Sequence, residues 1–136
     1  MAHPIIELQK TFVLALKNDA QLIALLGSDA VFDAPPKGRK PPFVVFSRHD
    51  VFSRDGDDAV INEHRLLVHC WHEEASRKAV LSIVERVVFV ALNADLSGAD
   101  LIVSHAHHER TDSAIDGKTG RARAIVAFRF FSEPVV

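Results

Sequence analysis

The sequence predicts an α+β fold, a single antiparallel β-sheet of about four to five strands packed on one face by two α-helices. Three observations carry this prediction. Apolar residues recur at helical spacing near the N-terminus and again after Ser76, apolar and polar residues alternate in several shorter segments, and turn residues separate those segments. The chain has 136 residues, the size of one domain, so we expect residues 1–136 to form a single unit.

Two regions have helical character. Residues 4–19 form the first, followed by a shorter helical run over residues 21–26 that ends at Gly27. The second begins after Ser76, a plausible N-cap, and ends at Asn93. Its apolar stripe comprises Val80, Ile83, Val84, Val87, Val88 and Ala91. Because further apolar residues widen that stripe, we expect another element or another subunit to cover a second side of this helix: Leu81, Phe89, Val90 and Leu92.

The strand candidates are residues 30–32, 43–47, 62–72, 101–109 and 121–131, which gives the order α, α, β, β, β, α, β, β. We expect a hairpin turn at residues 53–58 and another within residues 111–120, which contain Asp116-Gly117. Alternation places Leu66, Val68 and Cys70 on one face of their strand. It also gives the last strand one apolar face, formed by Ala122, Ala124, Val126, Phe128 and Phe130.

Composition limits the class of protein. The net charge is -2, with 16 basic and 18 acidic residues, so no overall field attracts the chain to nucleic acid or to an anionic membrane. A single cysteine, Cys70, excludes an intrachain disulfide and fits a reducing cytoplasm. The chain has no apolar run of membrane-spanning length and no signal-like N-terminus, so we expect a soluble, unexported protein.

Histidines form two groups that raise the question of a metal site: His69 and His72 beside Cys70, and His105, His107 and His108. Strand alternation puts His105 and His107 on one face, and a zinc site drawn from both groups is the alternative to solvated histidines. However, His69 and Cys70 point to opposite faces, and no CxxC or HExxH spacing occurs. The pattern favours solvated or hydrogen-bonded histidines and no metal.

Other catalytic and cofactor signatures are weak. No GxSxG motif occurs, and Cys70 lies mid-strand on an apolar face, as expected of a small buried side chain. Gly117-Lys118-Thr119-Gly120 lacks the glycine spacing and preceding strand of a phosphate-binding loop. We therefore expect no catalytic residues, no cofactor and no enzymatic activity.

Three charged groups are candidate partner surfaces, with a solvated polar surface as the alternative for each. Lys37, Arg39 and Lys40 lie in a proline-rich loop. Asp55, Asp57 and Asp58 lie at the tip of a hairpin that lacks the calcium-loop pattern. Arg121, Arg123 and Arg129 occupy alternate positions of the last strand.

The order of elements, together with three short segments, resembles the small tail-completion proteins, which are the tail terminators of long-tailed phages and of phage-like gene transfer agents. The segments are Val31-Phe32-Asp33-Ala34-Pro35-Pro36, Pro42-Phe43-Val44-Val45-Phe46 and Glu63-His64-Arg65-Leu66-Leu67-Val68-His69-Cys70-Trp71. The resemblance covers nearly the whole chain and implies a tail-terminator-like domain.

This resemblance implies a structural virion protein that caps the head-proximal end of a tail tube as a hexameric ring and joins the tail to the head connector. Its implied partners are further copies of itself, the tail tube protein and the connector, with DNA passing through the lumen without sequence-specific binding. Assembly would take place in the cytoplasm of a bacterial host, and the family has no catalytic residues to carry over. The alternatives are another neck component, such as a connector or tube subunit, and a small metal-binding or hydrolase domain.

Overall fold

A computed structural model describes residues 3–56 and 59–135 of the chain. The elements follow the predicted order and confirm the α+β class. They are α1 (Pro4–Lys17), α2 (Ala20–Leu26), β1 (Val31–Phe32), β2 (Phe43–Ser53), β3 (Asn62–His72), α3 (Arg77–Asn93), β4 (Leu101–Ile115) and β5 (Ala122–Pro134). Within the described ranges, none of the helices has the length and apolar character needed to cross a membrane.

The strands form one sheet in the order β1-β2-β3-β5-β4. Strands β2, β3, β5 and β4 are antiparallel to their neighbours, as predicted, whereas the short edge strand β1 is parallel to β2. The sheet is therefore mixed. The proline-rich loop explains this, because residues 33–42 bring the chain back to the starting end of β1 before β2 begins.

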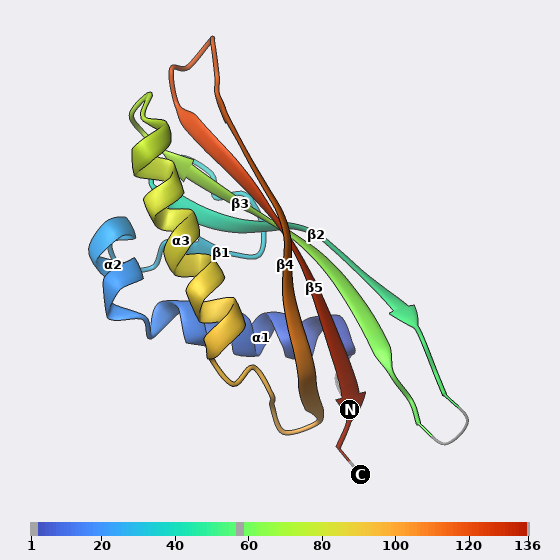
Figure 1. Ribbon diagram of the computed structural model, residues 1–136. Helices are drawn as coiled ribbons and strands as arrows, with labels where there is room; N and C mark the ends of the chain where they lie inside the picture. The colour runs from blue at the N-terminus through green and yellow to red at the C-terminus, as the bar shows by residue number, and fades with distance from the viewer. Residues whose placement is uncertain (1–2, 57–58, 136) are drawn as a thin grey trace.

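Helices α1 and α3 lie against the same face of the sheet, and α2 packs beside them (Figure 1). The core between the layers centres on Phe12, whose ring centroid lies 5.3 Å from that of Phe46. The same ring lies 5.8 Å from Phe128 and 5.8 Å from Phe130. Aromatic contacts from α1, β2 and β5 thus join the first helix to both halves of the sheet.

Three strands are longer than the sequence predicts. Strand β2 continues past residue 47 to Ser53, because a bulge between Phe46 and Arg48 shifts the alternation without ending the pairing with β3. Strand β4 continues to Ile115 and β5 to Pro134, and the two strands pair from Leu101 and Pro134 at one end to Ile115 and Ala122 at the other. The first helix is shorter than predicted, since Asp19 caps α2 instead: its carboxylate accepts a hydrogen bond from the Leu22 amide at 3.0 Å.

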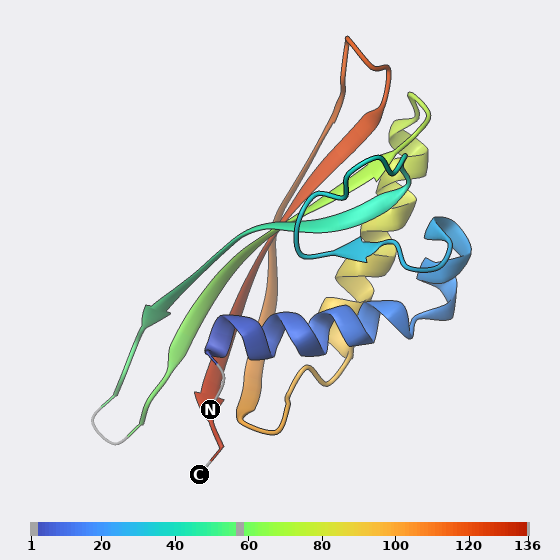
Figure 2. The same cartoon turned by 180° about the vertical axis from the view of Figure 1, so that it is seen from behind.

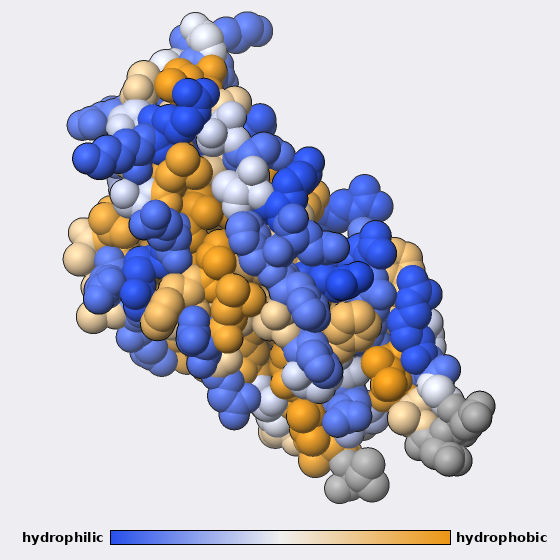
Figure 3. Space-filling model, viewed as in Figure 1, coloured by the Kyte–Doolittle hydropathy of each residue, from blue (hydrophilic) through white to orange (hydrophobic). Residues whose placement is uncertain are grey.

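The wide apolar surface of α3 is only partly covered. Val90 belongs to the core, whereas Phe89 is 49% and Leu92 is 46% exposed, so within the described chain no other element covers that side. Figure 3 shows apolar side chains gathered along α3. The guanidinium of Arg86 lies 4.2 Å from the Phe89 ring and donates to Asp19 at 2.6 Å and 2.9 Å, which ties α3 to α2.

Candidate interaction surfaces

The β2–β3 hairpin extends beyond the rest of the sheet as an arm (Figures 1 and 2). We call its described end, residues 52–56 and 59–61, the arm tip. Backbone hydrogen bonds join Arg54 to Ile61 at 2.7 Å and Gly56 to Ala59 at 3.0 Å, and the Asp55 carboxylate accepts from the Ile61 amide at 3.1 Å. These bonds give the arm tip a defined shape. The predicted interface residues Asp57 and Asp58 lie outside the described residues.

Charge at the base of the arm tip is compensated locally. Glu63 is buried and accepts hydrogen bonds from Arg65 at 2.8 Å and from Arg54 at 3.4 Å. The hydrogen bond from Arg65 is the main reason that the pKa of Glu63 is lowered. Both guanidinium groups also lie over Phe52, at 5.2 Å and 5.5 Å from its ring centroid. The exposed carboxylate of Asp55 is not part of this cluster.

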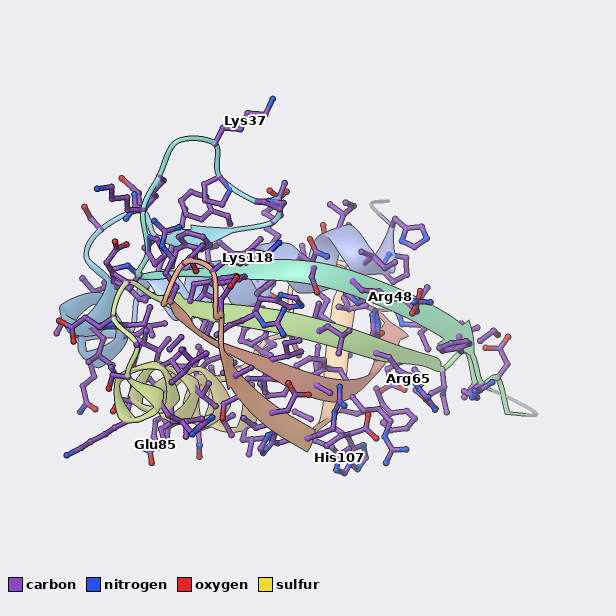
Figure 4. All side chains as sticks on the ribbon, turned by 90° about the horizontal axis from the view of Figure 1, so that it is seen from above. Lys37, Arg48, Arg65, Glu85, His107 and Lys118 are labelled. Carbon is purple, nitrogen blue, oxygen red and sulfur yellow. The ribbon has the colours of Figure 1, made fainter. Side chains whose placement is uncertain are left out.

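The basic loop, Lys37, Arg39 and Lys40, is exposed and lies at the opposite end of β2. Figure 4 shows Lys37 projecting from this loop, whereas Arg48 and Arg65 lie along the strands that lead to the arm tip. Arg39 lies 5.5 Å from the Phe32 ring centroid, and its side chain donates to the Ser28 carbonyl at 3.4 Å. Eleven residues of extended β2, roughly 30 Å, separate the basic loop from Asp55, so one molecule does not bring these opposite charges together.

A groove of about 530 Å³ is lined by residues of α1 and of the β1 edge. Its lining is mostly apolar, with Ile6 58% and Leu14 53% exposed. Lys10 and Lys17 line it together with Asp33. The remaining lining residues are Gln9, Val13, Val31 and Phe32. This groove was not predicted from the sequence, although Ile6 and Leu14 lie off the main apolar stripe of the first helix and indicate a second apolar face.

The predicted faces of the last strand are confirmed. Ala122, Ala124, Val126, Phe128 and Phe130 are all buried beneath the helices. On the opposite face, Arg123 lies 5.8 Å from the ring centroid of Trp71 and Arg129 lies 5.5 Å from that of Phe131. Arg121 precedes the strand and pairs with Glu73 at 3.6 Å. Among the described residues, the buried Nε of Arg129 has no hydrogen-bond partner.

The two histidine groups lie at opposite ends of β5. His69 and His72 stand beside Ile125 and Ala122, whereas His105 and His107 stand beside Phe131 and Arg129 at the other end. His105 and His107 share a face, as predicted, with parallel rings 6.1 Å apart. Within the described ranges, no three metal-ligating side chains cluster, so the register does not support a zinc site drawn from both groups. Cys70 is fully buried, as predicted, and burial raises its pKa to about 12.

Four polar side chains, two of them fully buried, form a hydrogen-bonded network that was not predicted from the sequence. The Gln9 side chain lies 3.1 Å from Nδ1 of His49, whose Nε2 lies 2.9 Å from Nδ1 of His64, and Nε2 of His64 lies 2.7 Å from the Ser132 hydroxyl. Loss of hydration lowers the pKa of each histidine to about 4, so both are neutral at pH 7. The Ser132–His64 contact has the distance of a nucleophile and its base, but both residues are fully buried and lack access to a substrate. This network of polar side chains therefore connects α1, β2, β3 and β5 inside the molecule.

Comparison with known proteins identifies a family that this chain matches. Residues 12–133 match the family described as "Tail completion protein gp17". A search of the curated protein sequences finds no match. Among solved structures, the chain is similar to one in "Virion of native gene transfer agent (GTA) particle", with a TM-score of 0.83 and 21% sequence identity over 97% of this chain and 99% of that chain. The structural match is evidence for a shared fold.

Proposed function

Because this chain belongs to the tail completion protein gp17 family, we propose that it caps the head-proximal end of a tail tube as a hexameric ring and joins the tail to the head connector. The observation that carries this proposal is the family match over residues 12–133, nearly the whole domain. The similarity in fold to a chain of a gene transfer agent particle supports a place in a phage or phage-like particle. The neck of the tail is the position we assign, with assembly in the cytoplasm of a bacterial host.

The proposed role is structural and not enzymatic. The two side chains with nucleophilic chemistry considered above, Cys70 and Ser132, are both fully buried. The net charge of -2 gives no general attraction for a polyanion. DNA would therefore pass through the lumen of the ring without sequence-specific binding. The proposed partners are further copies of the chain, the tail tube protein and the connector.

A ring of identical subunits needs two different surfaces on each subunit, because its contacts are head-to-tail. The molecule offers surfaces of opposite charge at the two ends of β2, the basic loop and Asp55. We propose that these residues, with Asp57 and Asp58, meet neighbouring subunits or tail proteins, and that Arg121, Arg123 and Arg129 face the tube or the connector. A single exposed ion pair contributes only about 0 to 1 kcal/mol, so repetition around a ring is needed for a useful total.

Imaging of particles assembled with and without this chain tests the proposal. We expect ring-shaped density at the head-proximal end of the tube when the chain is present, and tails that fail to join heads when it is absent. Density confined to the connector, separate from the tube end, would identify another neck component instead. Joined particles of normal yield without the chain would contradict the proposal.

Sedimentation of the isolated chain gives a second test. We expect a monomer or weak association at low concentration, because ring closure is favoured by the tube end that the ring covers. A tight two-fold dimer would count against a head-to-tail ring, since it would use the same surface on both subunits.

A further inference from the structure

We infer that the arm tip of one copy docks in the groove between α1 and β1 of the next copy, and that repetition of this contact closes the ring. This inference rests on the proposed function, because it names the surfaces by which the subunits would meet. It goes beyond the proposal in assigning an arm and a receiving groove to the two sides of the contact.

The groove has the properties of a receiving site. Ile6 and Leu14 lie two turns apart on α1 and are more than half exposed, at 58% and 53%. With Val13 they form an apolar wall that faces β1 across about 530 Å³. Apolar side chains lining a concave surface gain free energy when a partner excludes water from them.

The arm tip supplies a matching apolar insert. Val60 is 52% and Phe52 is 38% exposed at the end of the hairpin. The arm tip is held by the hydrogen bonds of Arg54 and Gly56 across the hairpin and by the contact between Asp55 and the Ile61 amide. Because these bonds already fix its shape, docking orders few additional groups, which lowers the entropic cost of association.

Charge favours the same pairing. Two lysines and one aspartate line the groove, Lys10 and Lys17 against Asp33, so its lining carries a net positive charge. Arg39 of the basic loop lies over Phe32 in the groove wall and adds a further cation nearby. The arm tip presents the exposed carboxylate of Asp55, while the buried carboxylate of Glu63 behind it is already neutralised by Arg54 and Arg65. The exposed carboxylate of Asp55 can therefore meet the lysines of the groove, and this charge pairing would orient the contact.

The fold separates insert and groove within one molecule. Figures 1 and 2 show the arm extending away from the helices, whereas the groove is lined by residues of α1 and β1. Different surfaces on each copy produce a heterologous contact, and such contacts generate rings when the rotation closes. The same pair of surfaces therefore yields a closed ring without any two-fold interface.

Cysteine cross-linking on assembled tails tests this contact. The variant carries Leu14→Cys in the groove and Val60→Cys in the arm tip, and a short bismaleimide joins the two thiols if they meet. The matched control carries Val60→Cys with Leu25→Cys, because Leu25 is another exposed leucine, on α2 and outside the groove lining. The natural Cys70 stays in both, since it is fully buried and its thiol is protected from the reagent.

We expect a ladder of cross-linked multimers up to the full ring for the Leu14/Val60 pair, and none for the control pair. Rings visible at the tube end without a Leu14/Val60 ladder would overturn the inference and leave the proposed function standing. A ladder on particles that show no ring at the tube end would support the arm contact and overturn the proposed function. Equal ladders for both pairs would overturn the inference, because they would indicate random collision.

A charge variant gives an independent readout if the cysteine pair assembles poorly. Val60→Asp places a carboxylate in the apolar insert, and Val135→Asp is its control at another exposed valine. We expect Val60→Asp to reduce ring formation at least tenfold and Val135→Asp to leave it unchanged, with the same melting temperature for both. Normal ring yield with Val60→Asp would overturn the inference.

Discussion

On strand β5, the side chains that face α3 and those on the opposite face accommodate charge differently. The covered face is apolar from Ala122 to Phe130 and admits polar groups only at Ser132, which lies against His64. The opposite face carries arginines, two of which lie over aromatic rings, Arg123 on Trp71 and Arg129 on Phe131. The comparison indicates that burial fixes the register of β5, whereas the uncovered face is free to vary and to meet a partner.

Phe128→Ala has the largest expected effect on this comparison. Its ring is 1% exposed and contacts Phe12 and Phe130, so truncation leaves a cavity between α1 and the sheet. We expect the free energy of unfolding to fall by about 3 to 5 kcal/mol in a denaturant titration. The control is Phe131→Ala, a half-buried phenylalanine of the same strand on the uncovered face, which should cost much less. Equal losses for the two variants would remove the distinction between the faces.

Acid should weaken the polar end of the covered face. The pKa values of His49 and His64 are lowered to about 4, mainly by loss of hydration, against an unfolded value of about 6.5. Between these values the unfolded chain binds more protons, so stability is fully present above about pH 6.5 and is lost as the pH falls towards 4.

We expect a loss on the order of 3 kcal/mol for each histidine across this window, measured as the free energy of unfolding at successive pH values. His64→Gln should reduce the pH dependence by about half, because glutamine does not titrate whereas His49 still does. The exposed His105 provides the control, and His105→Gln should leave the dependence unchanged. A flat profile in the natural chain would mean that the two histidines are hydrated in the folded state.

The covered face of β5 shows what the sequence pattern alone can predict. Alternation in residues 122–130 correctly gave the buried side of β5, because a one-residue shift would have buried arginines. The second half of β2 could not be predicted the same way. The bulge at Phe46/Arg48 reverses the alternation, so His49 and Val51 turn towards the helices while Asp50 between them turns outwards.

The polar network and the groove depend on tertiary contacts. His64 lies in phase with Leu66, Val68 and Cys70, and that phase alone indicates burial. Its partners Gln9 and Ser132 come from elements far away in sequence, so no local pattern joins them. The parallel pairing of the two-residue strand β1 is likewise set by the loop that follows it, and β1 forms one side of the groove.

The ion pair between Asp19 and Arg86 in the helix layer should have an effect of intermediate size on the free energy of unfolding. Asp19 caps α2 and accepts two hydrogen bonds from Arg86, which lower the pKa of its carboxyl group. We expect Asp19→Ala to reduce the free energy of unfolding by about 1 to 2 kcal/mol at pH 7, since it removes both the cap and the ion pair. Asp19→Asn keeps a capping oxygen and should cost less. If asparagine costs as much as alanine, the ion pair, and not the cap, is the dominant contribution.

The smallest expected effect on stability is that of Arg123→Ala on the uncovered face. Arg123 is half-buried, and its guanidinium lies 5.8 Å from the Trp71 ring centroid, a contact that contributes about 0.5 to 1 kcal/mol at an exposed site. Loss of hydration and, after it, the Arg123 charge lower the pKa of His69. Removing Arg123 therefore also removes an unfavourable interaction with that histidine. These effects oppose each other, so we expect the melting temperature of the isolated chain to stay nearly unchanged.

If the uncovered face meets the tube or the connector, the same substitution should nevertheless weaken assembly, measured as the fraction of tails joined to heads. Lys118→Ala, on the exposed turn between β4 and β5, provides a control for the loss of one cation near that end of the sheet. A variant that melts normally and assembles normally would remove Arg123 from the interface. Unfolding by Arg123→Ala together with tolerance of Phe128→Ala would reverse the assignment of the two faces, because burial would then have to lie on the arginine side.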